Sequence, residues 1–444
     1  MVNGASIKCA WDDDALWAPG VDHTIELATI PFTHVEKRKN GAASAIPKGS
    51  VAESYSKARG LAGYLHHSTI GLADFHACQS RVGLEQRSIE QDVVTRWRSS
   101  HAMGDDLVYN KSAVLEMDKN PKYKEPGEVW GKNALGFVDW DHLEEGTACL
   151  LDAAEGSQLL EGDEYPTSSL VVPTVYRLMA TSSKSHSVYF RNRDEAEHND
   201  PLANAVTVAH DDLQVKIQEA RERSHARLTD RFHDSIPLSV KRYWFVSAML
   251  DPRFKKLSFD GDTFIKAGMR RDGVKWLSEE YNASFKHKVH DPSRKAAPPA
   301  GSNEDDEVTS ETTAAFLFQP KRRKVTSATS FKPRVPGEAN QVPTPATAPF
   351  PKDEDVPHHD ELAAYLSLPQ VDWVSDWDAL VWWEKNAKKF PNLRVMARQY
   401  LGCPATSATV ERLFSQVGIS FSPNRQRAPA ATVADIIFTK MNVA

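Results

Sequence analysis

The segment that most constrains this chain is a short amphipathic run from Cys403 to Ser415. Thr406 or Ser407 can cap the start of a helix there, because their hydroxyls accept hydrogen bonds from the first free backbone amides. Apolar residues then recur at the spacing of one helix face: Val410, Leu413, Phe414 and Val417. We therefore expect a helix whose buried stripe is flanked by one acidic residue, Glu411.

Glu411 has two interpretations on this evidence. A carboxylate at the margin of a core can ligate a divalent cation, since Mg²⁺ sites commonly use one or two carboxylates together with phosphate oxygens. Alternatively, Glu411 is solvated and pairs with a nearby base, as charged residues beside helix stripes usually are. The segment alone leaves both open.

The surrounding sequence resembles the C-terminal signature of hAT-superfamily transposases. The resemblance extends upstream over residues 382–401 and downstream over residues 424–442, in the order and spacing of the family's dimerisation region. It implies a protein that dimerises with itself or with related hAT chains. The residues that it implies for this contact are Trp382, Trp383, Leu413, Phe414 and Ile437.

The resemblance also implies a fold class, α+β and predominantly helical. Residues 1–104 are expected to form a partial ribonuclease H-like core, interrupted by a large helical insertion domain at 105–289. A linker at 290–357 precedes a C-terminal helical dimerisation module at 358–444, which contributes the last helix of the core. No membrane partner is expected.

Apolar spacing predicts further helices. One enters through Pro391 and buries a stripe of Leu393, Met396, Ala397, Tyr400 and Leu401. A second, long helix has one side made of Val206, Ala209, Leu213, Ile217 and Ala220. The stripes and tryptophans near the C-terminus carry more apolar surface than an isolated module could hide, so some should face another domain or chain.

A second block resembling the family runs from Asp92 to Ser100. We expect a buried strand that ends in Arg96 and Trp97, where a guanidinium can bind phosphate and an indole can stack on an unpaired base. The resemblance implies this DNA-binding role for both residues. The alternative is that Trp97 is a core residue at the end of a strand.

A third block, Pro19 to Leu27, resembles a family motif in which His23 aligns well and is implied to contact DNA. Gly20 stands where the family has a Cys or the second catalytic Asp, and glycine has no side chain to ligate metal. Asp22 lies close to that position but two residues off register, and it is a catalytic candidate. Two more blocks, 164–169 and 249–255, are typical of the family's helical insertion, and Asp251-Pro252 should stop a helix.

Composition gives no global sign of nucleic-acid binding, because the formal net charge is −6. The four cysteines form no CxxC pair, which argues against a zinc finger and a disulfide framework. The linker is rich in Pro, Ala, Ser, Thr and charge, which predicts disorder. Within it a basic cluster resembles a nuclear localisation signal, and the alternative is simple solvation of the linker. Its residues are Lys321, Arg322, Arg323 and Lys324.

The family cuts DNA with two early Asp residues and one late Glu that hold two divalent metal ions. Here the third block begins close to Met1, so we expect the first Asp to be missing and the chain to associate with DNA in the nucleus without cutting it. No cofactor is then expected. The alternative is a fragment of an active transposase, in which Glu411 is catalytic and binds Mg²⁺ or Mn²⁺.

Overall fold

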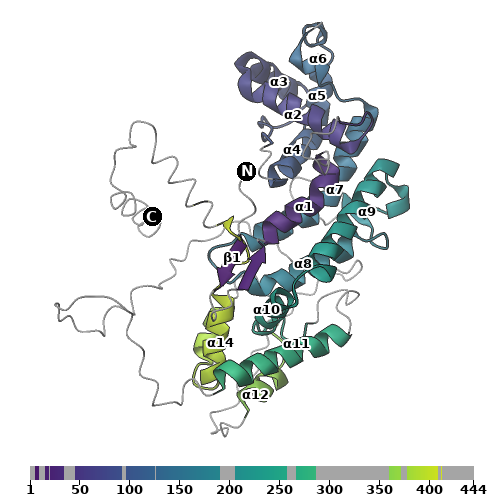
Figure 1. Cartoon of the computed structure of the whole chain (residues 1–444). Helices are drawn as coiled ribbons and strands as arrows, with labels where there is room; N and C mark the ends of the chain where they lie inside the picture. Colours follow the sequence, from purple (N-terminus) through teal and green to yellow (C-terminus); the bar gives the residue numbers. More distant parts are fainter. Residues whose placement is uncertain are drawn as a thin grey trace, which may run out of the picture. The chain divides into compact units, whose positions relative to one another are not determined.

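Figure 1 shows the helices and strands of the computed structural model, which divides into two compact units. The first contains residues 1–161, 170–241 and 405–444, and the second contains residues 162–169 and 242–404. These boundaries differ from those of the expected domains, whose division into core, insertion and module stays a prediction. The structure describes residues 6–9, 16–19, 21–34, 46–92, 97–125, 127–190, 206–257, 267–286, 360–371, 378–408 and 412.

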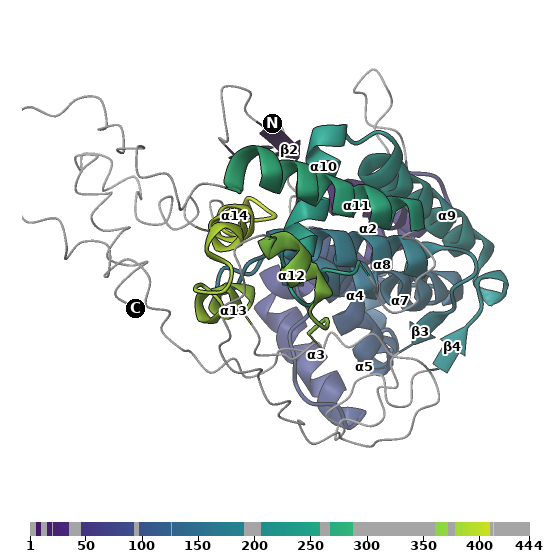
Figure 2. The ribbon, with the colours of Figure 1, turned by 90° about the horizontal axis from the view of Figure 1, so that it is seen from below.

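The first unit is predominantly helical, as expected. Its helices are α1 (Val21–Thr33), α2 (Val51–His67), α3 (Thr69–Arg81), α4 (Trp97–Tyr109), α5 (Lys111–Met117), α6 (Val129–Lys132), α7 (Phe137–Leu160), α8 (Val171–Ser182) and α9 (Val215–Thr229). Short 3₁₀ segments lie at Pro121–Lys124, Ser168–Leu170 and His210–Asp212, and a π-helical turn at Asp230–Asp234. Helices α7, α8 and α9 pack against one another (Figure 2).

The strands that the structure describes form two antiparallel ribbons. In one, β1 (Ser6–Cys9) pairs with β2 (Leu16–Pro19), and in the other β3 (Val188–Phe190) pairs with β4 (Val206–Val208). Ribbons of two strands do not establish the larger sheet of a ribonuclease H-like core. That core therefore stays a prediction.

The core of the first unit forms where α2, α4 and α7 meet. Tyr55, Met103 and Leu143, one from each helix, are completely buried. Gly104 permits the close approach of α4 to α7, because a Cβ atom there would lie 2.4 Å from the hydroxyl oxygen of Thr147. Burial of such side chains, at about 25 cal/mol per Å² of apolar surface, is the main favourable term in folding.

Helix α1 contains a proline, Pro31, that α9 compensates. Proline lacks an amide hydrogen, so the carbonyl of Leu27, one turn earlier, loses its usual helical donor. Arg227 of α9 donates from Nη1 to that oxygen at 2.9 Å. The two helices are thus joined by a hydrogen bond as well as by apolar packing.

The long helix expected across residues 206–220 begins later than its apolar spacing predicted. Val206 lies in strand β4 and is 64 % exposed, whereas α9 begins at Val215 and buries Ile217 and Ala220. Pairing with β3 and the turn at His210–Asp212 take up the first part of the segment. The prediction was wrong for that part and right for the second.

The second unit contains the end of α10 (Leu238–Met249), then α11 (Ala267–Glu280), a π-helical turn (Tyr281–Phe285), α12 (Glu361–Ser367), α13 (Ala379–Lys385) and α14 (Pro391–Leu401). Pro391 opens α14 as predicted, and the entire predicted stripe on that helix is buried. Helix α10 ends before Asp251-Pro252, which confirms the predicted stop.

Candidate protein-interaction site

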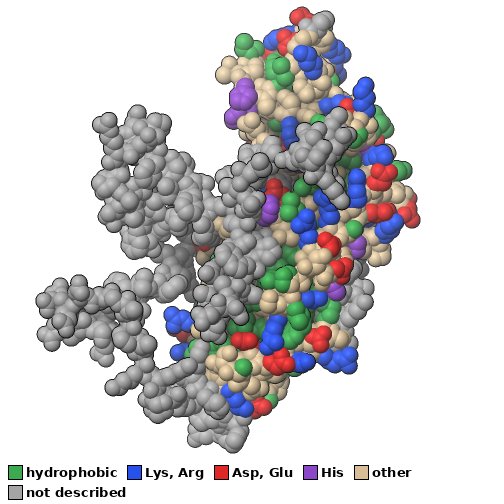
Figure 3. Space-filling view, viewed as in Figure 1, with side chains coloured by type: hydrophobic (Ala, Val, Ile, Leu, Met, Phe, Trp, Pro, Cys, Tyr) green, Lys and Arg blue, Asp and Glu red, His purple; other side chains and the backbone are tan. Residues whose placement is uncertain are grey.

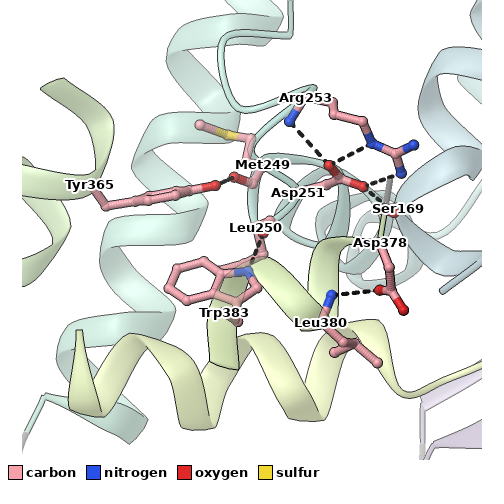
Figure 4. Close-up of polar contacts among 9 residues, drawn as sticks. All are labelled: Ser169, Met249, Leu250, Asp251, Arg253, Tyr365, Asp378, Leu380 and Trp383. Carbon is pink, nitrogen blue, oxygen red and sulfur yellow. Dashed lines mark hydrogen bonds and ion pairs between the residues drawn. The ribbon is translucent and has the colours of Figure 1, made fainter. Parts of the chain in front are cut away.

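Residues 249–255, at and after the end of α10, form a surface that binds the C-terminal helices; we call it the docking turn. The phenol of Tyr365 (α12) donates to the Met249 carbonyl oxygen at 2.9 Å, and Nε1 of Trp383 (α13) donates to the Leu250 carbonyl oxygen at 2.8 Å (Figure 4). Carbonyls at a helix end have no partner within the helix. The two aromatic side chains therefore satisfy the end of α10 while burying their rings.

Asp251, in the docking turn, is completely buried, and other groups surround its carboxylate (Figure 4). The Arg253 guanidinium donates to its two oxygens at 3.0 and 2.7 Å, and the Ser169 hydroxyl donates to Oδ2 at 2.9 Å. Buried charges are tolerated when they are paired and hydrogen-bonded. The pair therefore fixes the shape of the turn and joins it to residues 162–169.

Lys255 lies at the other end of the docking turn and is 2 % exposed. Its Nζ donates to the Tyr365 carbonyl oxygen at 2.9 Å and lies 5.0 Å from the centroid of the Tyr365 ring. Burial, with a smaller contribution from the charge of Lys256, lowers the pKa of Lys255 to about 8. The cation faces the last turn of α12, where the helix dipole favours positive charge.

Glu361, the first residue of α12, caps a different helix. Its Oε2 accepts from the backbone amides of Asn392 and Leu393, both at 3.0 Å, and its Oε1 accepts from the Asn392 side chain at 2.8 Å. These amides are among the free donors at the start of α14, where the helix dipole also favours an anion. Glu361 thus fixes α12 and α14 to each other.

Aromatic rings fill the space between these helices. Trp382 stacks on Phe390 with ring centroids 6.2 Å apart, and Tyr365 lies 5.0 Å from Trp383. Trp383 is 1 % exposed, because its own chain covers it almost completely. Trp382 is half-buried, so part of its ring remains accessible. Part of the expected surplus of apolar surface is therefore covered by the docking turn.

The three sequence blocks that carry the predicted catalytic and DNA-binding residues come together in the first unit. The amide of Val21, at the start of α1, donates to the Ala405 carbonyl oxygen at 3.3 Å. Arg98 pairs with the Glu161 carboxylate at 2.8 Å, and Arg412 donates to the Glu161 carbonyl oxygen. Each contact joins segments that are far apart in the sequence.

The individual residues of these blocks are only partly described. His23 is exposed on α1, and its Nδ1 lies 2.8 Å from Oε2 of Glu26. Asp22 is on the same helix, but its side chain is outside the described part. Trp97 is the first residue of α4, so the strand expected to end there does not reach it. Arg96, Glu411, Leu413, Phe414, Ile437 and the basic cluster Lys321, Arg322, Arg323 and Lys324 lie outside the described residues.

Neither a metal centre nor a ligand pocket emerges from the described side chains. Within them, no group of three or more His, Cys, Asp or Glu residues is placed to hold a metal ion. A cavity of about 20 Å³ between α1, α7, α8 and α9 is lined by Cys149, Asp152 and Arg221, among others. That volume holds about one water molecule. In the same described part, every helix is too short or too polar to cross a membrane.

Helices α12, α13 and α14 are thus held together, and to the docking turn, by buried polar contacts within the chain. Residues 361–443, which begin at the capping residue Glu361, match the hAT family C-terminal dimerisation region. The chain therefore carries the dimerisation region of the hAT family, and the resemblance to hAT transposases predicted from its sequence is confirmed.

Similarity to known proteins extends beyond that region. The chain is 21 % identical over 403 residues to a putative AC transposase of Zea mays, covering 88 % of this chain and 41 % of the maize protein. It is 21 % identical over 390 residues to zinc finger BED domain-containing protein 4 of Homo sapiens, covering 87 % and 27 % respectively. A putative AC9 transposase of Zea mays is 32 % identical over 89 residues, which are 20 % of this chain and 11 % of that protein. The chain thus spans less than half the length of each.

Sequence reasoning missed the residues that hold the interaction module in place. Glu361 and Lys255 act on partners far along the chain, and nothing in their local sequence marks those partners. Asp251 was assigned only a helix stop. An Arg two residues after an Asp at a helix end was the available signal that the aspartate was paired.

Proposed function

We propose that this chain is a transposase-derived protein that pairs with itself or with a related hAT chain through residues 358–444. The match of residues 361–443 to the family dimerisation region carries this proposal. Helices α12–α14 are held in a fixed arrangement that leaves Val381 41 % exposed and Trp382 half-buried. Preorganised apolar side chains lower the entropic cost of association.

Light scattering of the full chain during size-exclusion chromatography tests this proposal. A mass twice the 49.5 kDa of one chain, falling toward that of one chain on dilution, is the expected result. A mass of one chain at every concentration would exclude self-pairing, and a related hAT chain would then be tested as the partner by mixing.

We also infer that the protein associates with DNA in the nucleus. Support for this comes from the transposase relatives and from the Arg96-Trp97 and His23 blocks, around a core that we propose is ribonuclease H-like. The basic cluster Lys321, Arg322, Arg323 and Lys324 is the proposed nuclear signal. A reporter fused to residues 310–335 that stays cytosolic would remove this part.

Whether the protein cuts DNA is the second functional question. Gly20, in place of a ligating side chain, favours a protein that binds without cutting. The contact between Val21 and Ala405, which brings the segment before Glu411 to the start of α1, favours the alternative of metal-dependent strand cleavage. We propose the first. Nicking of DNA by the purified chain with Mg²⁺ or Mn²⁺, lost in Glu411→Gln, would establish the second.

A further inference from the structure

The stretch from Lys385 to Arg398 differs in charge from the average of the chain. The whole chain carries a formal charge of −6, and Lys and Arg side chains lie among Asp and Glu side chains over the upper and middle parts of the face in Figure 3. Between Lys385 and Arg398 the sequence has no acidic residue, and the nearest is Glu384. Its basic residues are all exposed: Lys385, Lys388, Lys389, Arg394 and Arg398.

The structure places two of these cations on one face of α14. The side of the helix that packs inward includes Leu393, Met396 and Tyr400. Arg394 and Arg398 are four residues apart on the opposite, solvent-facing side, about one helical turn from each other. Lys385 is the last residue of α13, Lys388 and Lys389 lie between α13 and α14, and we call these five residues the α14 basic face.

The α14 basic face lacks internal charge compensation. Among the described residues, none of its five cations has a carboxylate within ion-pair distance, and Lys389 instead lies 5.4 Å from the centroid of the Phe390 ring. Like charges four residues apart on a helix repel each other and destabilise it. The α11 helix of the same unit differs, because Lys275 there lies 3.8 Å from Glu279.

The start of α14 is already occupied by an anion from its own chain. Glu361 accepts hydrogen bonds from the amides of Asn392 and Leu393. A further anion would therefore be bound by the exposed side chains and not by the helix terminus. Five exposed cations within fourteen residues, two of them one turn apart on α14, suit a polymer with regularly spaced negative charges better than a single small anion.

We propose that the α14 basic face binds the phosphate backbone of DNA. The inference rests on the proposed DNA association and adds a contact surface inside the dimerisation region itself. Lys and Arg contacts to phosphate carry no sequence information, so this surface positions DNA and strengthens binding without selecting a site. In a dimer, two copies of the face would be present.

Fluorescence anisotropy of the full chain with a short labelled duplex of random sequence tests the proposal. The variant Arg394→Glu/Arg398→Glu should bind roughly tenfold or more weakly near 0.1 M salt, and the slope of log affinity against log salt should fall by about 2. Lys388→Glu/Lys389→Glu, outside the helix, should act in the same direction. Arg271→Glu/Lys275→Glu on α11, where acidic neighbours are present, is the matched control and should change affinity by less than about twofold.

The outcomes separate this proposal from the proposed function. A wild-type chain that binds no duplex would remove DNA association itself. If the wild-type chain binds duplex and both basic-face variants bind it equally well, only the proposed role of the α14 basic face is overturned. The same holds if the α11 control loses as much DNA affinity as the basic-face variants. The proposal would also be overturned if the basic-face variants lost the dimer but kept their DNA affinity. Binding of the basic face to anionic vesicles and not to duplex would overturn it as well.

Discussion

Lys255 shows how strongly position alters the chemistry of one side chain. An ordinary lysine is protonated at any physiological pH, but burial of Lys255 lowers its pKa to about 8. Its hydrogen bond to the Tyr365 carbonyl oxygen and its place over the Tyr365 ring offset part of the cost of desolvation. The docking turn thus contains a titratable group.

We predict that Lys255 makes the stability of the second unit depend on pH. Because the folded pKa is lowered from 10.5 to about 8, the unfolded chain holds the proton more tightly, and the free energy of unfolding should rise between those values. The slope is at most about 1.4 kcal/mol per pH unit. Urea denaturation between about pH 8 and 9.5 should show wild type gaining stability relative to Lys255→Met. Parallel curves for the two proteins would contradict the prediction.

The same pH series must stop below the titration of Tyr365. Burial raises the pKa of Tyr365 well above 10.0. The effect of Tyr365 on stability is therefore opposite to that of Lys255, because the free energy of unfolding falls with rising pH once the phenol ionises in the unfolded chain. The difference between wild type and Lys255→Met in the lower range isolates the lysine.

Glu361 gives a second prediction for a single residue. Replacement by Ala leaves the start of α14 without its anionic cap, and we expect the free energy of unfolding of the second unit to fall by about 1–3 kcal/mol. Tryptophan fluorescence during denaturation measures it, because Trp382 and Trp383 lie in that unit. Glu384→Ala, an exposed carboxylate on α13, is the control and should change stability by about 0.5 kcal/mol or less.

For single residues, the sequence predicted correctly those positions that depend on local helix spacing. Pro391 and the five apolar positions after it followed from helix periodicity, and every one is as expected. The Glu361 cap and the Lys255 contact could not be predicted, because each depends on a partner brought close only by the tertiary fold.

Among the helices, α1 and α9 pack against each other, and one hydrogen bond between them lies where Pro31 interrupts the hydrogen bonding of α1. Arg227 supplies the donor that the proline removes from Leu27. We predict that Arg227→Met costs about 0.5–1.5 kcal/mol in wild type and measurably less in a Pro31→Ala background, where residue 31 can donate the helical hydrogen bond itself. A double-mutant cycle by chemical denaturation measures this coupling, and strictly additive effects would show that Arg227 does not compensate for the proline.

The docking turn is the element that holds the C-terminal helices. We predict that Asp251→Asn, which leaves the buried Arg253 without its counter-charge, lowers the free energy of unfolding of the second unit by about 3–5 kcal/mol. Asp272→Asn, at an exposed position of α11, is the control and should have little effect. If Asp251→Asn were as stable as the control, the ion pair would not fix the turn.

Sequence predicted element type better than element boundaries. The expected helix across residues 206–220 has its first part in a β-ribbon, because strand pairing between β3 and β4 involves residues that periodicity alone assigns to a helix. Trp97 likewise opens α4 instead of closing a strand. At β4, pairing with β3 decided between two local conformations that the apolar pattern allows.

In the whole molecule, the family dimerisation region is divided between the two units, with residues 361–404 in the second and the residues from 405 onward in the first. Helices α12–α14 share the second unit with residues 162–169 and the end of α10, so residues 361–404 do not bury their aromatic side chains alone. Sequence predicted the region and its role by resemblance, and it predicted that some of its apolar surface would be covered. That the docking turn is the element covering this surface could not be predicted, because the contact depends on how distant segments of the second unit fold together.

The proposed pairing of chains occurs through the C-terminal region, in which the docking turn holds α12 and α13 in place. Light scattering of the full-length chain with Val381→Glu tests it most directly, against Val274→Glu as control, because both valines are 41 % exposed on helices of the same unit. We expect a dimer for wild type and for Val274→Glu, and a dissociation constant raised roughly tenfold or more for Val381→Glu. Equal dissociation of the two variants, or a wild-type chain that is monomeric throughout, would contradict it.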